Sequence, residues 1–155
     1  MKLIGVDYGR RRIGLAVSDE SGSHVRGLPT IDRKKHSRPL APLCLVIANE
    51  HAKGIVMGLP LDSNELETAM SAEVKLFAEG LRKETNLKVF FIDESLSSKE
   101  ATELLRFRRK KERRDKGAID RIAACLILEA FLKEHPPDAP LIPSPPDSLS
   151  PEERS

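Results

Sequence analysis

Residues Lys2–Ser18 read KLIGVDYGRRRIGLAVS, two short apolar runs separated by a polar turn that carries three arginines. The first run, Lys2–Asp7, ends in a carboxylate and predicts a buried strand followed by a turn. The second run, Ile13–Ser18, predicts another strand. Asp19–Ser23 has the composition of a turn, and His24–Thr30 predicts a third strand. Three short strands joined by tight turns favour an antiparallel meander.

Beyond the meander, helical and strand patterns alternate. We predict helices within Pro42–Ala52, from an Asn64 cap to Leu81, from near Lys99, and over Ala118–Lys133, with strands at Gly54–Gly58 and Leu87–Ile92. Each strand–helix–strand unit requires parallel pairing through a right-handed crossover. The sequence therefore predicts an α/β fold with a five-stranded mixed sheet. An antiparallel meander of strands 1–3 is followed by two parallel strands, and helices flank the sheet.

One domain and a tail account for the whole chain. Residues 1–134 have the composition of a folded domain, whereas residues 135–155 are rich in Pro, Ser and acidic residues and predict a flexible tail. The apolar run at the N-terminus is too short for a signal peptide or a membrane span. Cys44 and Cys125 lie far apart without metal-ligand spacing, so we expect two buried thiols and no zinc site. These features predict a cytoplasmic protein with no membrane partner.

Three carboxylates occur where apolar elements begin or end. Asp7 closes the first strand, Glu94 follows the last strand, and Asp120 lies near the start of the last helix. If the first and last strands run parallel, Asp7 and Glu94 emerge at one edge of the sheet, where the last helix can bring Asp120 to them. Such a cluster repels itself unless divalent cations bind, and Mg²⁺ prefers these hard oxygen ligands. Alternatively, these residues serve as a turn starter, a solvated loop residue and a helix-dipole partner.

Basic residues are concentrated just before the last helix. Arg106–Lys116 reads RFRRKKERRDK, with eight basic and two acidic residues, although the whole chain has a net charge of only +2. Such a run is typical of an electrostatic anchor for nucleic acid, and a solvated mobile loop is the alternative. The candidate phosphate-binding residues here are Arg108, Arg109, Lys110, Lys111, Arg113, Arg114 and Lys116.

Further candidate phosphate contacts lie beside the predicted carboxylates. Gly9 allows positive φ in the turn after Asp7 and a close approach of phosphate to the backbone. Arg10, Arg11 and Arg12 form a basic turn there. Backbone amides near Ser97 and Ser98 could meet a phosphate at a helix N-terminus. A plain hairpin glycine, a solvated hairpin tip and simple helix capping are the corresponding alternatives.

Four colinear motifs between Lys2 and Leu132 resemble those of the YqgF/RuvX family. They are GVDYGRRRIGLAVSD at residues 5–19, GLP at 58–60, DESLSS at 93–98 and KGAIDRIAACLILEAFL at 116–132. The resemblance implies a ribonuclease H-like fold related to the RuvC junction resolvases. It also implies an Mg²⁺- or Mn²⁺-dependent nuclease, and two such ions at the carboxylate cluster could activate a water and stabilise the leaving oxygen. The acidic site residues of the family fall on Asp7, Glu94 and Asp120.

The sequence departs from the family pattern at several positions. Arg10 stands where the family usually has Thr, Ser95 where it has Arg, and Ser97-Ser98 where it has Thr-Thr. The serine pair keeps the hydroxyl groups. The missing arginine removes either a phosphate contact or a residue that orients the site, and we hypothesise that Arg10 offsets that loss.

Two classes of function fit these patterns. The resemblance implies an enzyme that matures the 5′ end of the small-subunit ribosomal RNA precursor (pre-16S rRNA). The alternative enzyme is a Holliday junction resolvase that cuts branched DNA, which would work as a symmetric homodimer. The second class is a non-catalytic assembly factor that binds ribosomal RNA through the basic run. The DxG sequence at residues 7–9 followed by a strand also occurs in actin-like ATPases, but that fold needs two such domains and this chain is too short for both. The chain also lacks the Walker motif of other nucleotide-binding proteins.

Overall fold

The computed structural model describes residues 1–60, 68–93 and 116–135. Its elements in chain order are β1 (Leu3–Asp7), β2 (Arg12–Ser18), β3 (Val25–Asp32), α1 (Leu40–Asn49), β4 (Gly54–Leu59), α2 (Ala69–Thr85), β5 (Lys88–Asp93) and α4 (Lys116–Glu134). This order confirms the predicted succession of three strands followed by alternating helices and strands. The helix predicted from near Lys99 lies outside the described residues, as does the predicted tail after residue 135.

The strands form one five-stranded sheet in the order β3-β2-β1-β4-β5. β1 pairs antiparallel with β2, which pairs antiparallel with β3, whereas β1, β4 and β5 are parallel. The predicted mixed sheet is therefore confirmed. β1 and β3 both run antiparallel to β2, and β4 and β5 run parallel to β1. The carboxyl-terminal ends of β1, β3, β4 and β5 therefore all lie at one edge of the sheet. We call this edge the carboxyl edge, and Asp7 lies on it.

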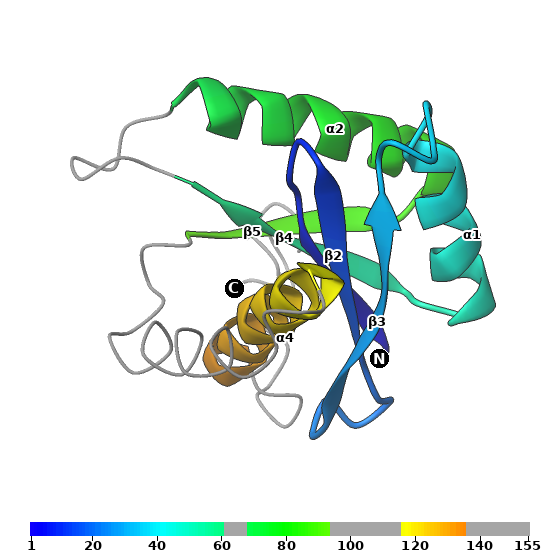
Figure 1. Ribbon diagram of the computed structural model, residues 1–155. Coiled ribbons are helices and arrows are strands. Elements are labelled where there is room, and N and C mark those ends of the chain that lie inside the picture. The colour runs from blue at the N-terminus through cyan, green and yellow to red at the C-terminus, as the bar shows by residue number, and fades with distance from the viewer. Residues whose placement is uncertain (61–67, 94–115, 136–155) are drawn as a thin grey trace, which may run out of the picture.

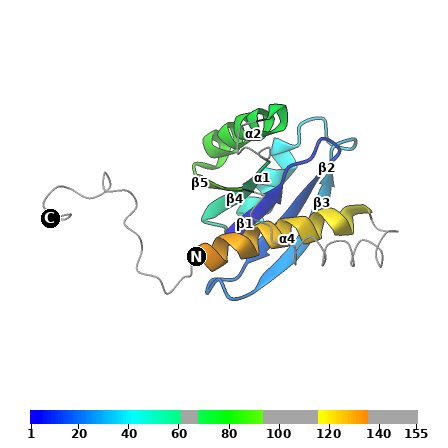
Figure 2. The same ribbon diagram turned by 90° about the vertical axis from the view of Figure 1, so that its left-hand side faces the viewer.

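Helices cover both faces of the sheet (Figures 1 and 2). α1 and α2 pack on one face, and α4 crosses the other. β1 serves both layers because successive side chains of a strand point to opposite faces. Ile4 and Val6 belong to the core with α1 and α2, whereas Leu3 packs in the cluster that contains Leu128 of α4. The near-continuous apolar character of β1 thus follows from burial on both faces.

Two glycines allow α4 to lie close to the backbone of the sheet. A Cβ atom at Gly5 would lie 2.9 Å from both the carbonyl oxygen of Ala124 and the Cβ of Leu128. A Cβ atom at Gly14 would lie 2.0 Å from the carbonyl oxygen of Asp120. Neither position accepts a side chain without a shift of the helix. The start of α4 is therefore held directly over β2 beside Asp7.

Several element boundaries differ from the predicted ones. α2 begins after Thr68, whose hydroxyl accepts a hydrogen bond from the Ser71 amide at 3.1 Å, while the Ser71 hydroxyl accepts one from the Thr68 amide at 2.6 Å. The prediction of Asn64 as the cap was therefore wrong, because this reciprocal capping box starts the helix later. β3 continues to Asp32, beyond the predicted end at Thr30. α1 begins at Leu40, before the predicted start at Pro42.

Cys44 and Cys125 are half-buried and are not joined in a disulfide. We predicted two buried thiols, whereas both cysteines are partly exposed. Burial raises the pKa of the Cys44 thiol, and the negative charge of Glu84 adds to that effect. Cys44 is therefore a weakly reactive packing residue rather than a nucleophile.

Candidate active site

Asp7 and the first turn of α4 lie on the same face of the sheet. Asp7 is directly opposite Gly14 in the β1–β2 register. Residues directly opposite in an antiparallel pair share a face, and Gly14 lies against the backbone of Asp120. The alternation along β1 agrees, since Leu3 and Gly5 also face α4. Sequence reasoning predicted that these two carboxylates share the carboxyl edge, and the structure brings Asp7 and Asp120 to it together.

The Asp120 carboxylate already has a cationic partner. Arg12 Nε donates a hydrogen bond of 2.7 Å to Asp120 Oδ2. Both side chains are partly shielded, with exposed fractions of 32% for Arg12 and 21% for Asp120. A charge-assisted bond of this length is stronger than a neutral one. It fixes one carboxylate oxygen of Asp120 and leaves the other oxygen outside this bond.

The turn that follows Asp7 is held by α2. The Tyr8 hydroxyl donates to Glu73 Oε1 at 2.9 Å, and Arg10 Nε donates to Glu73 Oε2 at 3.1 Å. The hydrogen bond from Tyr8, and then the one from Arg10, lower the pKa of Glu73. Burial raises the pKa of Tyr8, and its bond to Glu73 raises it further. At neutral pH the pair is therefore a protonated phenol and an ionised carboxylate.

The same turn is held from β3 by Arg33. One Arg33 nitrogen, Nη1, donates to the Tyr8 hydroxyl at 3.1 Å and to the Gly9 carbonyl at 3.0 Å. The guanidinium carbon lies 5.2 Å from the centre of the Tyr8 ring, a cation–π distance. The Tyr8 ring also packs on Phe77 of α2, with centroids 4.8 Å apart. We call these four residues, Tyr8, Arg10, Arg33 and Glu73, the turn network. The turn network connects the loop after Asp7 to α2 and to the segment after β3.

Sequence reasoning missed Glu73 and Arg33. Glu73 lies 65 residues from Tyr8 and Arg33 lies 25 residues from it, so no local pattern joins them. The available signal was compositional, a basic run directly after the third strand. For Gly9, the predicted positive φ was wrong, because Gly22 is the only glycine with positive φ in the described part of the chain. Gly9 is instead required by space, since a Cβ there would lie 2.4 Å from the Arg12 carbonyl oxygen.

The three arginines of the predicted basic turn have different surroundings. Arg10 pairs with Glu73 at 3.0 Å and Arg12 pairs with Asp120, while Arg11 is exposed and has no ion-pair partner among residues 1–60, 68–93 and 116–135. We hypothesised that Arg10 offsets the missing family arginine. Its ion pair with Glu73 would compete with a phosphate for the Arg10 side chain.

Other predicted site residues lie outside the described residues. These are Glu94, Ser97, Ser98, Arg108, Arg109, Lys110, Lys111, Arg113 and Arg114. Lys116 begins α4, but its side chain is not described. Within the described ranges, no group of three or more His, Cys, Asp or Glu residues could hold a metal ion. Asp7 and Asp120 therefore lie near each other at the carboxyl edge, and Glu94 follows the last described residue of β5.

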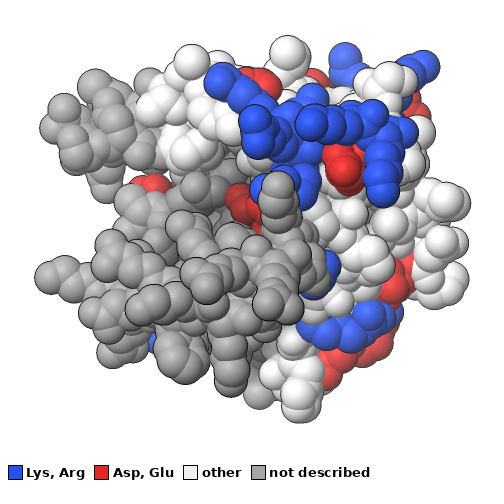
Figure 3. Space-filling view, viewed as in Figure 1, with Lys and Arg blue, Asp and Glu red and all other residues white. Residues whose placement is uncertain are grey.

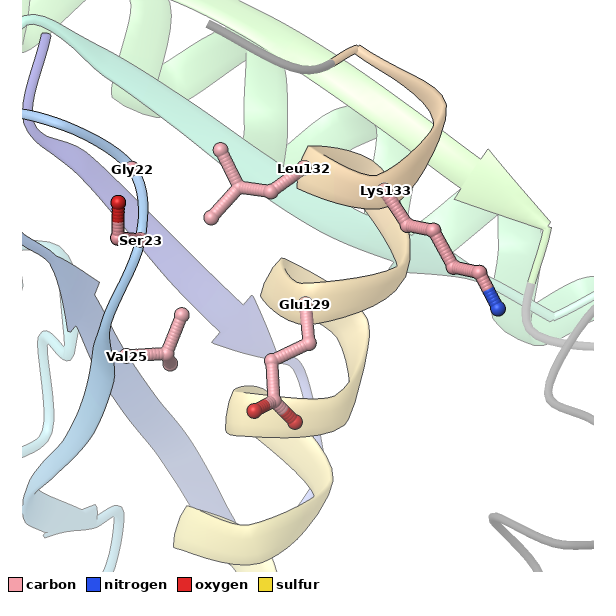
Figure 4. Close-up of a pocket in the computed structure, with 6 residues that line it drawn as sticks. All are labelled: Gly22, Ser23, Val25, Glu129, Leu132 and Lys133. Atoms are coloured by element: carbon pink, nitrogen blue, oxygen red, sulfur yellow. The ribbon is translucent and has the colours of Figure 1, made fainter.

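A shallow pocket lies at the other end of the sheet (Figure 4). It has a volume of about 230 Å³ and is lined by Gly22, Ser23, Val25, Glu129, Leu132 and Lys133. Leu132 points toward Gly22 and Ser23, whereas the Lys133 amine points away from them. The pocket is formed by the β2–β3 turn and the last turns of α4, away from Asp7. It contains no convergent carboxylates, and it is not part of the candidate active site.

None of the helices within the described residues is long and apolar enough to cross a membrane.

Comparison with known proteins agrees with this fold and identifies the family. The RuvX family model, described as a Holliday junction resolvase, matches residues 1–134. A relative from Synechococcus elongatus named "Putative pre-16S rRNA nuclease" is 37% identical over 131 residues, covering 84% of this chain and 88% of that protein. A relative of the same name from Koribacter versatilis is 39% identical over 132 residues, covering 85% and 86% of the two chains.

Two of the similar solved structures are junction resolvases. RuvC from T. thermophilus in complex with a Holliday junction substrate has a TM-score of 0.59 at 18% identity, covering 88% of this chain and 98% of that chain. The fowlpox virus Holliday junction resolvase has a TM-score of 0.54 at 11% identity, covering 87% and 99% of the two chains. These likenesses establish the ribonuclease H-like fold.

The sheet order and the resolvase structures that share it define the ribonuclease H-like fold, and the family model and the named relatives place the chain among the nucleases. Within that class, the chain belongs to the RuvX (YqgF) family.

Proposed function

We propose that this nuclease hydrolyses phosphodiester bonds with divalent metal ions in the 5′-end maturation of pre-16S rRNA. The observation that carries the chemistry is the placement of Asp7 and Asp120 on one face at the carboxyl edge. The names of the relatives at 37% and 39% identity support the substrate. Residues 1–134, which the family model matches, would form the nuclease domain, and residues 135–155 a flexible tail.

The donor set fits a hard divalent cation. Asp7 and Asp120 offer carboxylate oxygens, and Glu94 would supply a third carboxylate directly after β5. β5 ends at the same edge as β1, so the proposed ligands come from elements that converge there. Oxygen-only ligands favour Mg²⁺ or Mn²⁺ over zinc. When bound, two such ions activate a water and stabilise the leaving oxygen of an in-line displacement at phosphorus.

The chain's own residues would position these groups. Arg12 orients the Asp120 carboxylate, and the turn network fixes the loop after Asp7. Gly9, Arg10, Arg11 and Arg12 lie beside the carboxylates and would contact the nucleic-acid backbone, which positions the substrate without reading sequence. We extend this proposal to Ser97, Ser98 and the basic run, namely Arg108, Arg109, Lys110, Lys111, Arg113, Arg114 and Lys116.

A four-way DNA junction is the competing substrate. The description of the family model and the resolvase structures that share the fold favour testing it. A resolvase would require a symmetric homodimer to cut two strands, whereas an RNA-maturing nuclease can act as a monomer. The non-catalytic alternative needs only binding to ribosomal RNA.

The test is a cleavage assay with Mg²⁺ or Mn²⁺ on a 5′-extended precursor 16S rRNA and on a four-way DNA junction. We expect cleavage of the precursor RNA, loss of cleavage in Asp7→Asn, and RNA binding largely retained in that variant. Asp19→Asn serves as the control, because Asp19 lies beyond the other end of β2. Junction cleavage alone would replace the proposed substrate. Cleavage that persists in Asp7→Asn would contradict the proposed site.

A further inference from the structure

A second basic segment follows β3. Residues 33–38 read RKKHSR, with two lysines, two arginines and a histidine in six positions. Arg33 is half-buried by its contacts with Tyr8 and Gly9, whereas Lys34, Lys35, His36 and Arg38 are exposed. The segment therefore has one residue anchored to the turn network and three exposed lysine and arginine side chains.

This segment lies against the turn that follows Asp7. The Arg33 amide donates to the Arg11 carbonyl at 2.9 Å, and Arg12 is paired with Asp32 in the β2–β3 register. Figure 3 shows lysine and arginine side chains gathered over the β1–β2 turn and the segment after β3. Because β1 and β3 flank β2, their ends lie about 10 Å apart. The basic surface is therefore close to Asp7 at the same carboxyl edge.

Much of this positive charge is not neutralised within the described part of the protein. Arg10 and Arg12 have carboxylate partners, Glu73 and Asp120. None of the ion pairs between described residues involves the exposed side chains of Arg11, Lys34, Lys35 or Arg38. The nearest acidic residue in the sequence, Asp32, accepts a hydrogen bond from the Lys34 amide at 2.9 Å. We call Arg11, Lys34, Lys35 and Arg38 the β3 basic surface.

We propose that the β3 basic surface binds the sugar-phosphate backbone of the nucleic acid on one side of the scissile phosphate. The position of that phosphate rests on the proposed function. Lysine and arginine recognise phosphates electrostatically and release counterions on binding. The surface contains no aromatic side chain, so base stacking is not its mode of binding. At a rise of about 3.4 Å per nucleotide along one strand, the contacted phosphates lie a few nucleotides from the cleavage point.

The surface is distinct from the basic run before α4. It directly follows β3, and Arg33 connects it to the turn beside Asp7. The turn network gives the β3 basic surface a fixed position relative to Asp7, so its contacts would set the register of the substrate.

The test compares two double variants in the full chain that remove equal charge. Lys34→Gln/Lys35→Gln removes two cations from the surface. Lys53→Gln/Lys88→Gln is the matched control, because Lys53 and Lys88 are also exposed. They lie where β4 and β5 begin, at the edge of the sheet opposite the carboxyl edge. Each pair is made in the Asp7→Asn background, so that binding is measured without cleavage. Fluorescence anisotropy follows a labelled precursor 16S rRNA fragment and a labelled four-way junction over a range of salt concentrations.

We expect the surface variant to bind about tenfold or more weakly at ~0.1 M salt, with a salt slope shallower by about one to two. The control variant should bind as the parent does. Equal binding by the two double variants would overturn the proposal, even if cleavage still depends on Asp7. A surface variant with reduced binding would support the proposal, even if the preferred substrate proves to be the DNA junction. Loss of affinity only for anionic lipid vesicles would assign the surface to a membrane and overturn it.

Discussion

Arg12 and Asp120 are joined by a hydrogen bond of 2.7 Å between Nε and Oδ2, although they lie 108 residues apart in sequence. The bond ties the first residue of β2 to the first turns of α4. It also holds the positively charged guanidinium of Arg12 beside the Asp120 carboxylate, which we propose as a metal ligand. Arg12 and the proposed divalent ion would therefore act on the same carboxylate, Arg12 by orienting it and the ion by binding to it. This relationship has consequences for both metal affinity and cleavage.

Arg12→Gln should tighten divalent-metal binding and weaken cleavage. Removing the guanidinium removes a cation that repels the incoming ion, and a partly exposed ion pair contributes up to about 1 kcal/mol. We expect Mn²⁺ to bind about two- to fivefold more tightly, measured by isothermal titration calorimetry without nucleic acid. Cleavage should fall because Asp120 loses its orienting partner. Arg11→Gln is the control for metal affinity, and unchanged or weaker Mn²⁺ binding by Arg12→Gln would refute the competition.

Gly14→Ala should destabilise the fold strongly. The new Cβ would lie 2.0 Å from the Asp120 carbonyl oxygen, and backbone cannot swing aside as a flexible side chain can. Overpacking of this kind costs about 1–3 kcal/mol or more. Urea denaturation of the full chain measures the loss. Gly80→Ala in α2 is the contrast, because its nearest neighbour is the end of the flexible Leu40 side chain at 3.0 Å, and alanine favours a helix. An equal loss of stability in both variants would contradict this explanation.

Local patterns predicted most of the architecture. Apolar runs with turn residues between them identified β1, β2, β4 and β5, because a buried strand requires only a few consecutive apolar residues. The parallel pairing followed from the intervening helices, and it correctly placed Asp7 at the edge that α4 approaches. Asp120 was found because its neighbours at helical spacing are apolar. These signals depend on residues close in sequence, which is why they could be interpreted without coordinates.

The partners of the site residues could not be predicted in the same way. An exposed arginine has many carboxylates within reach, and only the packed fold decides that Arg12 meets Asp120 and that Arg10 meets Glu73. Arg33 was overlooked because a basic residue after a strand is typical of a solvated loop. The Asn64 cap failed for a related reason, since several polar residues before α2 could cap it and Thr68 alone completes the box.

Asp19→Asn should lower the melting temperature at neutral pH but not in strong acid. Burial would raise the pKa of Asp19, but hydrogen bonds from Ser21 and from His24, with backbone amides, lower it from 3.8 to about 2. The stabilisation is therefore fully present above the unfolded value of 3.8 and is lost as pH falls through about 2. Thermal unfolding by circular dichroism should show a difference between wild type and variant that disappears over this interval. A constant difference down to the lowest pH would show that the carboxylate charge is not the cause.

Tyr8→Phe should impair cleavage without preventing folding. The substitution keeps the ring against Phe77 but removes the hydroxyl that donates to Glu73 and accepts from Arg33. Losing this bridge costs about 1 kcal/mol of folding free energy and frees the loop after Asp7. We expect kcat to fall more than KM rises, because Tyr8 positions the loop after Asp7 and is not itself one of the proposed substrate contacts.

A double-mutant cycle distinguishes this positioning role from a general loss of stability. Glu73→Gln weakens the partner of Tyr8, so Tyr8→Phe and Glu73→Gln should be coupled, and their combined effect on kcat should be smaller than the product of the two separate effects. The pKa of Glu73 is lowered chiefly by the hydrogen bond from Tyr8. Its contribution to stability is therefore present above its ordinary pKa of 4.5 and lost as pH falls through the lower value of the folded protein. The stability difference between wild type and Glu73→Gln should shrink over that range, whereas Glu84→Gln on the same helix provides the control for charge. Independent, multiplicative effects on kcat would show that Tyr8 and Glu73 do not hold the Asp7 loop as one unit.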